Sequence, residues 1–205
     1  MFESVLANGL SEASIWCDYI FLDKEERRRF TQATHEYLID QLQYTGSETV
    51  TGTFNNIKLT LNHPVKELVW VTQREDRIHC STQPKQPFNF TDTVSENPTL
   101  SAKLQLNGRD RFESRFGAYF NFVQPFQHHT NTPAVGINVY YFALKPEDHQ
   151  PSGSCNFSRI DTAVLNLTLS TKTFDGNTAA HVRIYALNYN ILRITSGMGG
   201  LVYSN

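Results

Sequence analysis

The sequence predicts an all-β fold, an eight-stranded antiparallel sandwich preceded by one strand and one helix. Two observations favour this fold class. Several short segments alternate apolar and polar residues with the period of two that β-strands show, as in Ala163–Leu169. Turn signals such as Asn107-Gly108 separate these segments, and a single stretch, residues 23–43, carries apolar residues at helical spacing. Irregular loop lengths and the lack of an internal repeat argue against a propeller or a solenoid.

The N-terminal part is predicted to form one strand and one helix. Residues 14–22 have apolar side chains on both faces of the expected strand, so we expect it to be covered on each side. Asp23 is a suitable helix N-cap, and Glu26 completes a capping-box pattern three residues later. The expected helix spans residues 23–43 and ends near Gly46. Its buried stripe is predicted at Phe30, Ala33, Tyr37, Leu38 and Leu42.

The rest of the chain is predicted to consist of strands joined by loops. The expected strands cover residues 57–62, 68–71, 100–107, 137–144, 163–169, 182–186 and 188–194. A polar loop is expected at 73–92, and a longer loop, first charged and then aromatic, at 109–133. Asp175-Gly176 marks another turn, and the glycines at 197–200 give the last strand the backbone freedom to turn at the end of a sheet.

Composition excludes several classes of protein. The 205 residues suit one domain, and 40% hydrophobic content is enough for a core. A net charge of -2 gives no electrostatic reason to expect direct nucleic-acid binding. Cys17, Cys80 and Cys155 are widely separated and match neither a metal-binding nor a disulfide-dense pattern. No apolar run is long enough for a membrane span, and the N-terminus has no signal-peptide pattern, so we expect a soluble protein kept in the cytosol.

The histidines raise the possibility of a metal site, and their spacing argues against one. His128 and His129 are adjacent, with His63 and His149 elsewhere in the chain. Metal-binding jelly rolls of the cupin type place two histidines two residues apart, which puts both on one face of a strand. Adjacent residues of a strand point to opposite faces instead. We therefore expect no metal and no cofactor, and interpret this region as a polar, aromatic-rich loop at a subunit contact.

Patterns typical of catalysis are also missing. The sequence contains no nucleophile-elbow motif and no phosphate-binding glycine loop. Cys155 has His149 nearby in the sequence, across a Pro-Ser-Gly loop, and this proximity does not establish a catalytic pair. The carboxylates of Asp110, Glu113 and Asp148 fall in predicted loops, where solvation is the ordinary explanation. We expect that the protein is not an enzyme and assign no catalytic residue.

One alternative function is a free-standing carbohydrate-binding, lectin-like module. Residues 120–131 combine aromatic and amide side chains, the types that bind sugars in loops, although the same types also make protein contacts. Three glycosylation sequons begin at Asn89, Asn156 and Asn166. In a chain without a secretory signal we interpret them as unmodified polar positions, and Asn166 lies within a predicted strand.

Several long motifs, in the same order, resemble the major capsid proteins of nucleocytoplasmic large DNA viruses, the group of mimiviruses, chloroviruses and iridoviruses. The strongest is the C-terminal stretch 188–205, NYNILRITSGMGGLVYSN. The others are residues 18–30 (DYIFLDKEERRRF), 35–42 (HEYLIDQL), 62–70 (NHPVKELVW), 124–133 (QPFQHHTNTP) and 143–161 (ALKPEDHQPSGSCNFSRID). The resemblance extends from about Ser14 to the end of the chain.

The resemblance implies a jelly-roll sandwich and a structural role in a virion. Members of that family carry two consecutive jelly rolls, and this chain is long enough for the second one alone. Residues 1–22 would then be a remnant of the last strand of a missing first jelly roll, residues 23–46 a linker helix, and residues 47–205 the C-terminal jelly roll. The resemblance also implies a homotrimeric, pseudo-hexagonal capsomer that contacts neighbouring capsomers or minor capsid proteins in an icosahedral shell, assembled in the cytoplasm of the host cell.

Overall fold

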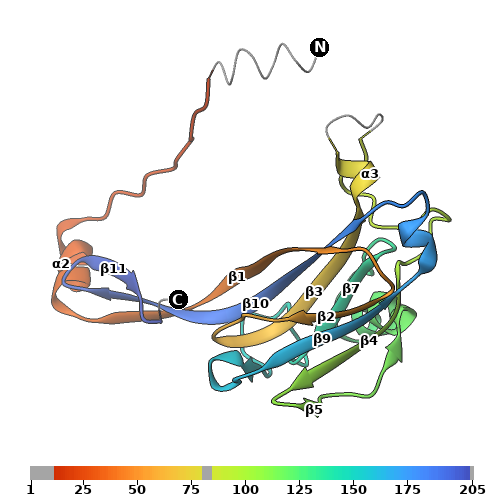
Figure 1. Ribbon diagram of the computed structural model, residues 1–205. Helices are drawn as coiled ribbons and strands as arrows, with labels where there is room; N and C mark the ends of the chain where they lie inside the picture. The colour runs from red at the N-terminus through yellow and green to blue at the C-terminus, as the bar shows by residue number, and fades with distance from the viewer. Residues whose placement is uncertain (1–11, 80–84, 204–205) are drawn as a thin grey trace.

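A computed structural model describes residues 12–79 and 85–203. The strands of the described residues form two antiparallel sheets that pack face to face (Figure 1). One sheet has the order β1-β10-β3-β7, formed by His35–Val50, Ala180–Thr195, Pro64–Arg74 and Ile137–Tyr141. Two short strands extend it: β11 (Met198–Leu201) pairs with β10, and β8 (Cys155–Asn156) pairs with β3.

The second sheet has the order β2-β9-β4-β5, formed by Phe54–Lys58, Ala163–Leu169, Thr99–Leu106 and Arg109–Asp110. A further short strand, β6 (Arg115–Phe116), pairs with β4. Successive long strands alternate between the two sheets, since β1, β3, β7 and β10 lie in the first and β2, β4 and β9 in the second. This is the topology of a jelly roll, so the predicted all-β fold is confirmed. The described residues form eleven strands, because β6, β8 and β11 add to the two four-stranded paths.

The core lies between the sheets and follows the predicted alternation. In β9 every second residue from Ala163 to Leu169 is buried, and β10 shows the same pattern from Ala180 to Ala186. The largest fully buried side chain is Trp70 of β3, whose ring packs edge-on against Phe120 at 5.1 Å. Burial of such aromatic side chains supplies much of the stabilisation of a sandwich.

The predicted helix 23–43 is wrong beyond Gln32. Helix α2 spans Lys24–Gln32, and Asp23 caps it as predicted, because Asp23 Oδ1 accepts a hydrogen bond from Glu26 N at 2.8 Å. The chain then turns at Ala33 and forms β1, in which His35–Val50 pair with β10. Gly46, predicted to end the helix, instead lies at a β-bulge with φ +99°. Strand pairing therefore begins at residue 35, twelve residues before the predicted start of the jelly roll.

The long loop predicted at 109–133 is partly helical. A π-helical turn, η1 (Tyr119–Val123), continues into α4 (Gln124–His128). Phe120 packs this segment against the sandwich, because its side chain is fully buried and contacts Phe112 as well as Trp70. The remaining short helices are α3 (Glu75–Ile78), η2 (Phe157–Arg159) and η3 (Thr171–Phe174). Among the described residues, no helix has the length and apolar character needed to cross a membrane.

The predicted turns are confirmed. Asn107 and Gly108 have φ of 50° and 75° and join β4 to β5, and Gly176 and Asn177 also have positive φ. Ser196 and Gly197, at 53° and 77°, form the tight turn between β10 and β11 that the glycine-rich C-terminus predicted.

Candidate assembly surfaces

The most distinctive surface is an arm that projects from the sandwich. Strand β3 pairs with β10 only from Ala180 to Asn188, and β10 continues for seven more residues to Thr195. Beyond Asn188, β10 pairs with the first half of β1 on one side and with β11 on the other. Figure 1 shows this arm extending to one side of the molecule, with α2 at its end. A sheet that leaves its sandwich in this way exposes faces that another domain or subunit can cover.

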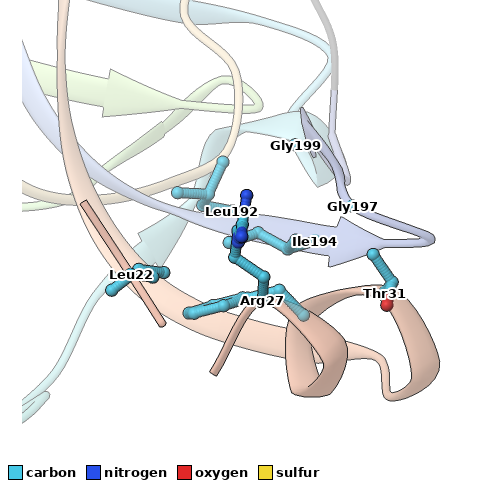
Figure 2. Close-up of a pocket in the computed structure, with 8 residues that line it drawn as sticks. Leu22, Arg27, Thr31, Leu192, Ile194, Gly197 and Gly199 are labelled. Carbon is cyan, nitrogen blue, oxygen red and sulfur yellow. The ribbon is translucent and has the colours of Figure 1, made fainter. Parts of the chain in front are cut away.

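An apolar groove of about 470 Å³ lies between α2 and the arm (Figure 2). Phe30 and Thr31 of α2 form one wall, and Leu192 and Ile194 of β10 form the floor. Gly197 N donates a hydrogen bond to Phe30 O at 3.1 Å and so holds α2 against the hairpin. The other lining residues are Leu22, Arg27, Gly197 and Gly199. Figure 2 shows Arg27 extending from α2 toward the strand that carries Leu192 and Ile194.

The segment before α2 is exposed and apolar. Residues 12–23 contain no strand, so the predicted strand 14–22 is not formed in this chain, and residues 1–11 of the predicted remnant lie outside the described residues. Among the described residues no strand pairs with this segment. Trp16 is 94% exposed and Phe21 is 93% exposed. Exposure of several large apolar side chains in one segment marks a surface that contacts another chain or domain.

A second apolar patch lies on η1 and α4. Phe122, Val123 and Phe126 are exposed there and, together with Thr132, line a shallow hollow of about 300 Å³. Phe126 is 83% exposed. This patch belongs to the segment predicted to make subunit contacts, and its chemistry suits that interpretation because aromatic residues anchor protein interfaces.

The structure places the four histidines apart from one another, except for His128 and His129. His128 Nδ1 lies 2.8 Å from Leu144 O, and His129 hydrogen-bonds to Glu67 and Glu147. His63 is buried beside the ring of Tyr203, and His149 is exposed in a loop. Among the described residues, no three histidine, cysteine, aspartate or glutamate side chains are grouped so that they could hold a metal ion.

The residues considered as catalytic candidates are partly buried in a strand, hydrogen-bonded to neighbouring side chains or exposed to solvent. Cys155 lies in β8, where burial raises the pKa of its thiol despite the opposing charge of Arg111, so the unreactive protonated form is favoured. Asp110 accepts hydrogen bonds from Gln105 at 2.7 Å and Lys103 at 3.3 Å, and these contacts lower its pKa. Glu113 and Asp148 are exposed.

The carbohydrate-binding alternative is not favoured by the segment that suggested it. Phe120 is part of the core, and the side-chain nitrogen of Asn121 donates to Ala134 O and Ile137 O. The side chain of Gln124 bonds Tyr119 and the backbone of Tyr141. Of the sequon asparagines, Asn89 bonds Arg77 and Thr91, Asn156 caps η2, and Asn166 faces outward on β9.

Two features of these surfaces were not predicted. The arm was missed because residues 35–42 were assigned to a helix, although Tyr37, Ile39 and Gln41 alternate with Leu38, Asp40 and Leu42 as a strand would. The bonds of His129 join residues 62 and 18 positions away, and such pairings have no local sequence signal.

The fold defines a jelly-roll protein with exposed apolar surfaces. Comparison with known proteins supplies the family. Residues 26–200 match the model of the large eukaryotic DNA virus major capsid protein, so the chain belongs to that family. The major capsid protein of Phaeocystis pouchetii virus is 44% identical, over 96% of this chain and 54% of that protein. That of Paramecium bursaria Chlorella virus 1 is also 44% identical, over 94% of this chain and 54% of that protein.

Solved structures agree with the sequence relatives. The crystal structure of PBCV-1 VP54, fitted into a cryo-EM reconstruction of the virophage Sputnik, superposes with a TM-score of 0.73. It is 43% identical and covers 91% of this chain and 56% of that one. The Faustovirus major capsid protein, at 13% identity and a TM-score of 0.70, shares the fold. The chain spans about half the length of the curated relatives it matches.

Proposed function

We propose that this chain is the C-terminal jelly roll of a viral major capsid protein and acts as a structural subunit of an icosahedral shell. The observation that carries this proposal is the shared jelly-roll fold, at 43% identity to VP54 over 91% of the chain. Function then resides in the surfaces that meet other domains and subunits. We propose no catalytic turnover and no bound cofactor, and the net charge of -2 supports a role without direct nucleic-acid contact.

The missing half of the relatives' length would be a first jelly roll that precedes this one. Residues 12–22 would be its last strand, and α2 would be the linker. The support is that both faces of the expected strand are apolar, that no strand among the described residues pairs with it, and that its apolar side chains are exposed. Because β1 begins at His35, the boundary of the second jelly roll is better placed near residue 35 than at 47.

The groove between α2 and the arm fits the same arrangement. Its floor at Leu192 and Ile194 is apolar, and Leu22, the residue that precedes the helix cap, lies on its rim. A domain that ends at Leu22 would be tethered directly beside this groove. We therefore propose that side chains of the preceding jelly roll fill it, so that the arm serves as the contact between the two domains.

Assembly would follow from two jelly rolls standing side by side. Three such chains would form a pseudo-hexagonal capsomer, which would contact neighbouring capsomers or minor capsid proteins in the virion, after assembly in the host cytoplasm. The exposed patch at Phe122 and Phe126 is a candidate for one of these contacts. An obligate subunit interface of this kind buries roughly 2,000 Å² or more in total.

The test is the oligomeric state of the longer polypeptide. This chain is expressed alone and fused to a first jelly roll, taken from the Phaeocystis pouchetii virus major capsid protein, and both are examined by sedimentation velocity. The fused protein is expected to be a trimer. A matched variant that carries Leu192→Asp in the groove is expected to lose the trimer while the sandwich still folds by circular dichroism. A fused protein that stays monomeric at high concentration would contradict the proposal.

A further inference from the structure

His129 lies between two carboxylates that come from different parts of the fold. Its Nε2 is 3.0 Å from Glu67 Oε2, and its Nδ1 is 2.7 Å from Glu147 Oε1. Glu67 belongs to β3 and its side chain is 11% exposed, whereas Glu147, in the loop after β7, is 39% exposed. One imidazole ring therefore joins the sheet to the loop.

The number of protons on the ring decides whether both bonds can form. An ionised carboxylate only accepts hydrogen bonds, and a neutral imidazole has one N–H group and one bare nitrogen. Both ring nitrogens can donate only when the ring is the doubly protonated imidazolium. We propose that His129 is a proton-controlled clamp, which holds the loop 145–151 on the sheet while doubly protonated and releases it when one proton passes to solvent.

The loop is attached to the rest of the protein close to this ring. Glu147 Oε2 accepts a hydrogen bond from Thr130 N at 3.1 Å, and Glu147 Oε1 accepts one from the Thr130 hydroxyl at 3.2 Å. His128 Nδ1 lies 2.8 Å from Leu144 O, just before the loop. The two ends of the loop are joined to each other, since Lys145 N donates to the Ser152 hydroxyl at 2.8 Å. The bonds of Glu147 are therefore one attachment of the loop, and the buried Pro146 beside it is another.

Exposure indicates which of the two bonds breaks first. When the ring is neutral, it has one N–H group and can donate one hydrogen bond. That bond stabilises the protein most at Glu67, because water reaches this carboxylate less than it reaches Glu147. Glu147 can replace its hydrogen bond to the ring with one to water, so the bond between His129 and Glu147 is the one that breaks. A hollow of about 210 Å³, lined by both Glu67 and His129, gives the ring contact with solvent.

The other titratable groups around the ring do not interfere. Tyr141 of β7 packs against His129 at 5.1 Å and His128 at 4.8 Å between ring centroids. Burial, and then the charges of Glu67 and Glu147, raise the pKa of Tyr141, so it stays neutral. Burial acts to raise the pKa of Glu147 as well, but the hydrogen bonds from His129 and Thr130 outweigh it and the pKa is lowered.

The sign of the pH dependence follows from these groups. A carboxyl group with a lowered pKa in the folded state stabilises that state above its unfolded pKa, and the effect disappears as the pH falls through the folded value. The contact to Glu147 is therefore lost at strongly acidic pH, when Glu147 is protonated. The contact also requires the doubly protonated ring, because only that form donates from both nitrogens. The clamp is closed while Glu147 is ionised and His129 is doubly protonated.

The test follows His129 and the loop in the same samples of the full chain across this range. Imidazole ¹⁵N spectra report which ring nitrogens carry protons, and amide hydrogen exchange, corrected for its intrinsic pH dependence, reports the order of 145–151. While the loop is protected, both nitrogens of His129 are expected to be protonated. Loop exchange is expected to accelerate roughly tenfold as His129 loses a proton, the effect of one lost charge-assisted hydrogen bond.

Variants separate the clamp from general loosening of the loop. Glu147→Gln is expected to speed loop exchange and to remove its dependence on His129. The matched control Asp148→Asn, at an exposed acid in the next position, is expected to keep the wild-type acceleration of loop exchange when His129 loses a proton. His128→Gln is expected to raise loop exchange throughout but to keep the same acceleration. Loop exchange that does not change when His129 deprotonates, or a singly protonated His129 while the loop is protected, would overturn the proposal.

Discussion

Lys66 Nζ lies 2.9 Å from Asp40 Oδ2 and joins the sandwich to the arm. Lys66 is on β3 and its side chain is 2% exposed, whereas Asp40 is on the projecting half of β1 and is 39% exposed. The ammonium group also lies 5.3 Å from the centre of the Tyr189 ring, on the facing part of β10. A buried ammonium needs a compensating charge, so this pair fixes where the arm leaves the sheet.

Replacing Asp40 should therefore destabilise the protein. In Asp40→Asn the buried ammonium loses its carboxylate, and we expect the free energy of unfolding to fall by about 1.5–3 kcal/mol, the range for hydrogen bonds to charged groups. Urea denaturation followed by tryptophan fluorescence measures this change. The control is Asp110→Asn, which breaks the solvent-exposed pair with Lys103 and should change little. Equal effects in the two variants would show that the burial of Lys66 has no energetic consequence.

Phe120 should be as important to stability as a core residue of a strand. Its side chain is fully buried against Trp70, Phe112 and Tyr119, so Phe120→Ala leaves a large cavity. We expect a loss of about 3–5 kcal/mol in chemical denaturation. Phe126→Ala removes the same side chain at an exposed position and should have little effect. A small loss at Phe120 would mean that η1 and α4 are not integral to the sandwich.

Strands such as β9 could be predicted because they have one buried and one outward face. The alternation at Ala163–Leu169 reports burial directly, and the Asn-Gly turn at 107–108 has a local conformational requirement. The helix prediction failed at residues 33–42 for a different reason. Apolar residues occur there on both faces, which satisfies the helical and the strand periods alike, and pairing with β10 decides the outcome.

The surfaces could be predicted less well than the fold. The segment around His128 and His129 was expected to be a loop, and its burial through Phe120 depends on a contact with Trp70, fifty residues earlier. The groove needs α2, β10 and β11 together, and the helix and the hairpin are separated by more than 150 residues. Neither arrangement leaves a pattern within a short window of sequence.

The turn between β10 and β11 should depend on Gly197. Its φ is +77°, and a Cβ atom would also lie 3.3 Å from Thr31 Cγ2, so Gly197→Ala should cost about 1–2 kcal/mol of left-handed strain. Because the hairpin lies on the arm, we expect faster amide exchange in β11 and α2 and a nearly unchanged melting temperature. Gly200→Ala is the control, since its Cβ would meet nothing within 4 Å. Protection of β11 that survives in Gly197→Ala would contradict this account of the turn.

Removing the chain up to Phe21 should raise solubility without weakening the sandwich. Ile15, Trp16 and Phe21 are each more than 90% exposed, and the described part of this segment forms no strand pairs, so little stabilising burial is lost with it. Leu22 and the helix cap Asp23 are kept, which preserves the groove and α2. We expect the melting temperature to change little and the concentration at which the protein aggregates to rise, because exposed apolar segments promote association. The matched control keeps full length and carries Trp16→Ser and Phe21→Ser, and should show the same gain in solubility. A fall of many degrees in melting temperature after the deletion would show that the segment belongs to the core of this jelly roll, and the proposal that it completes a preceding domain would then fail.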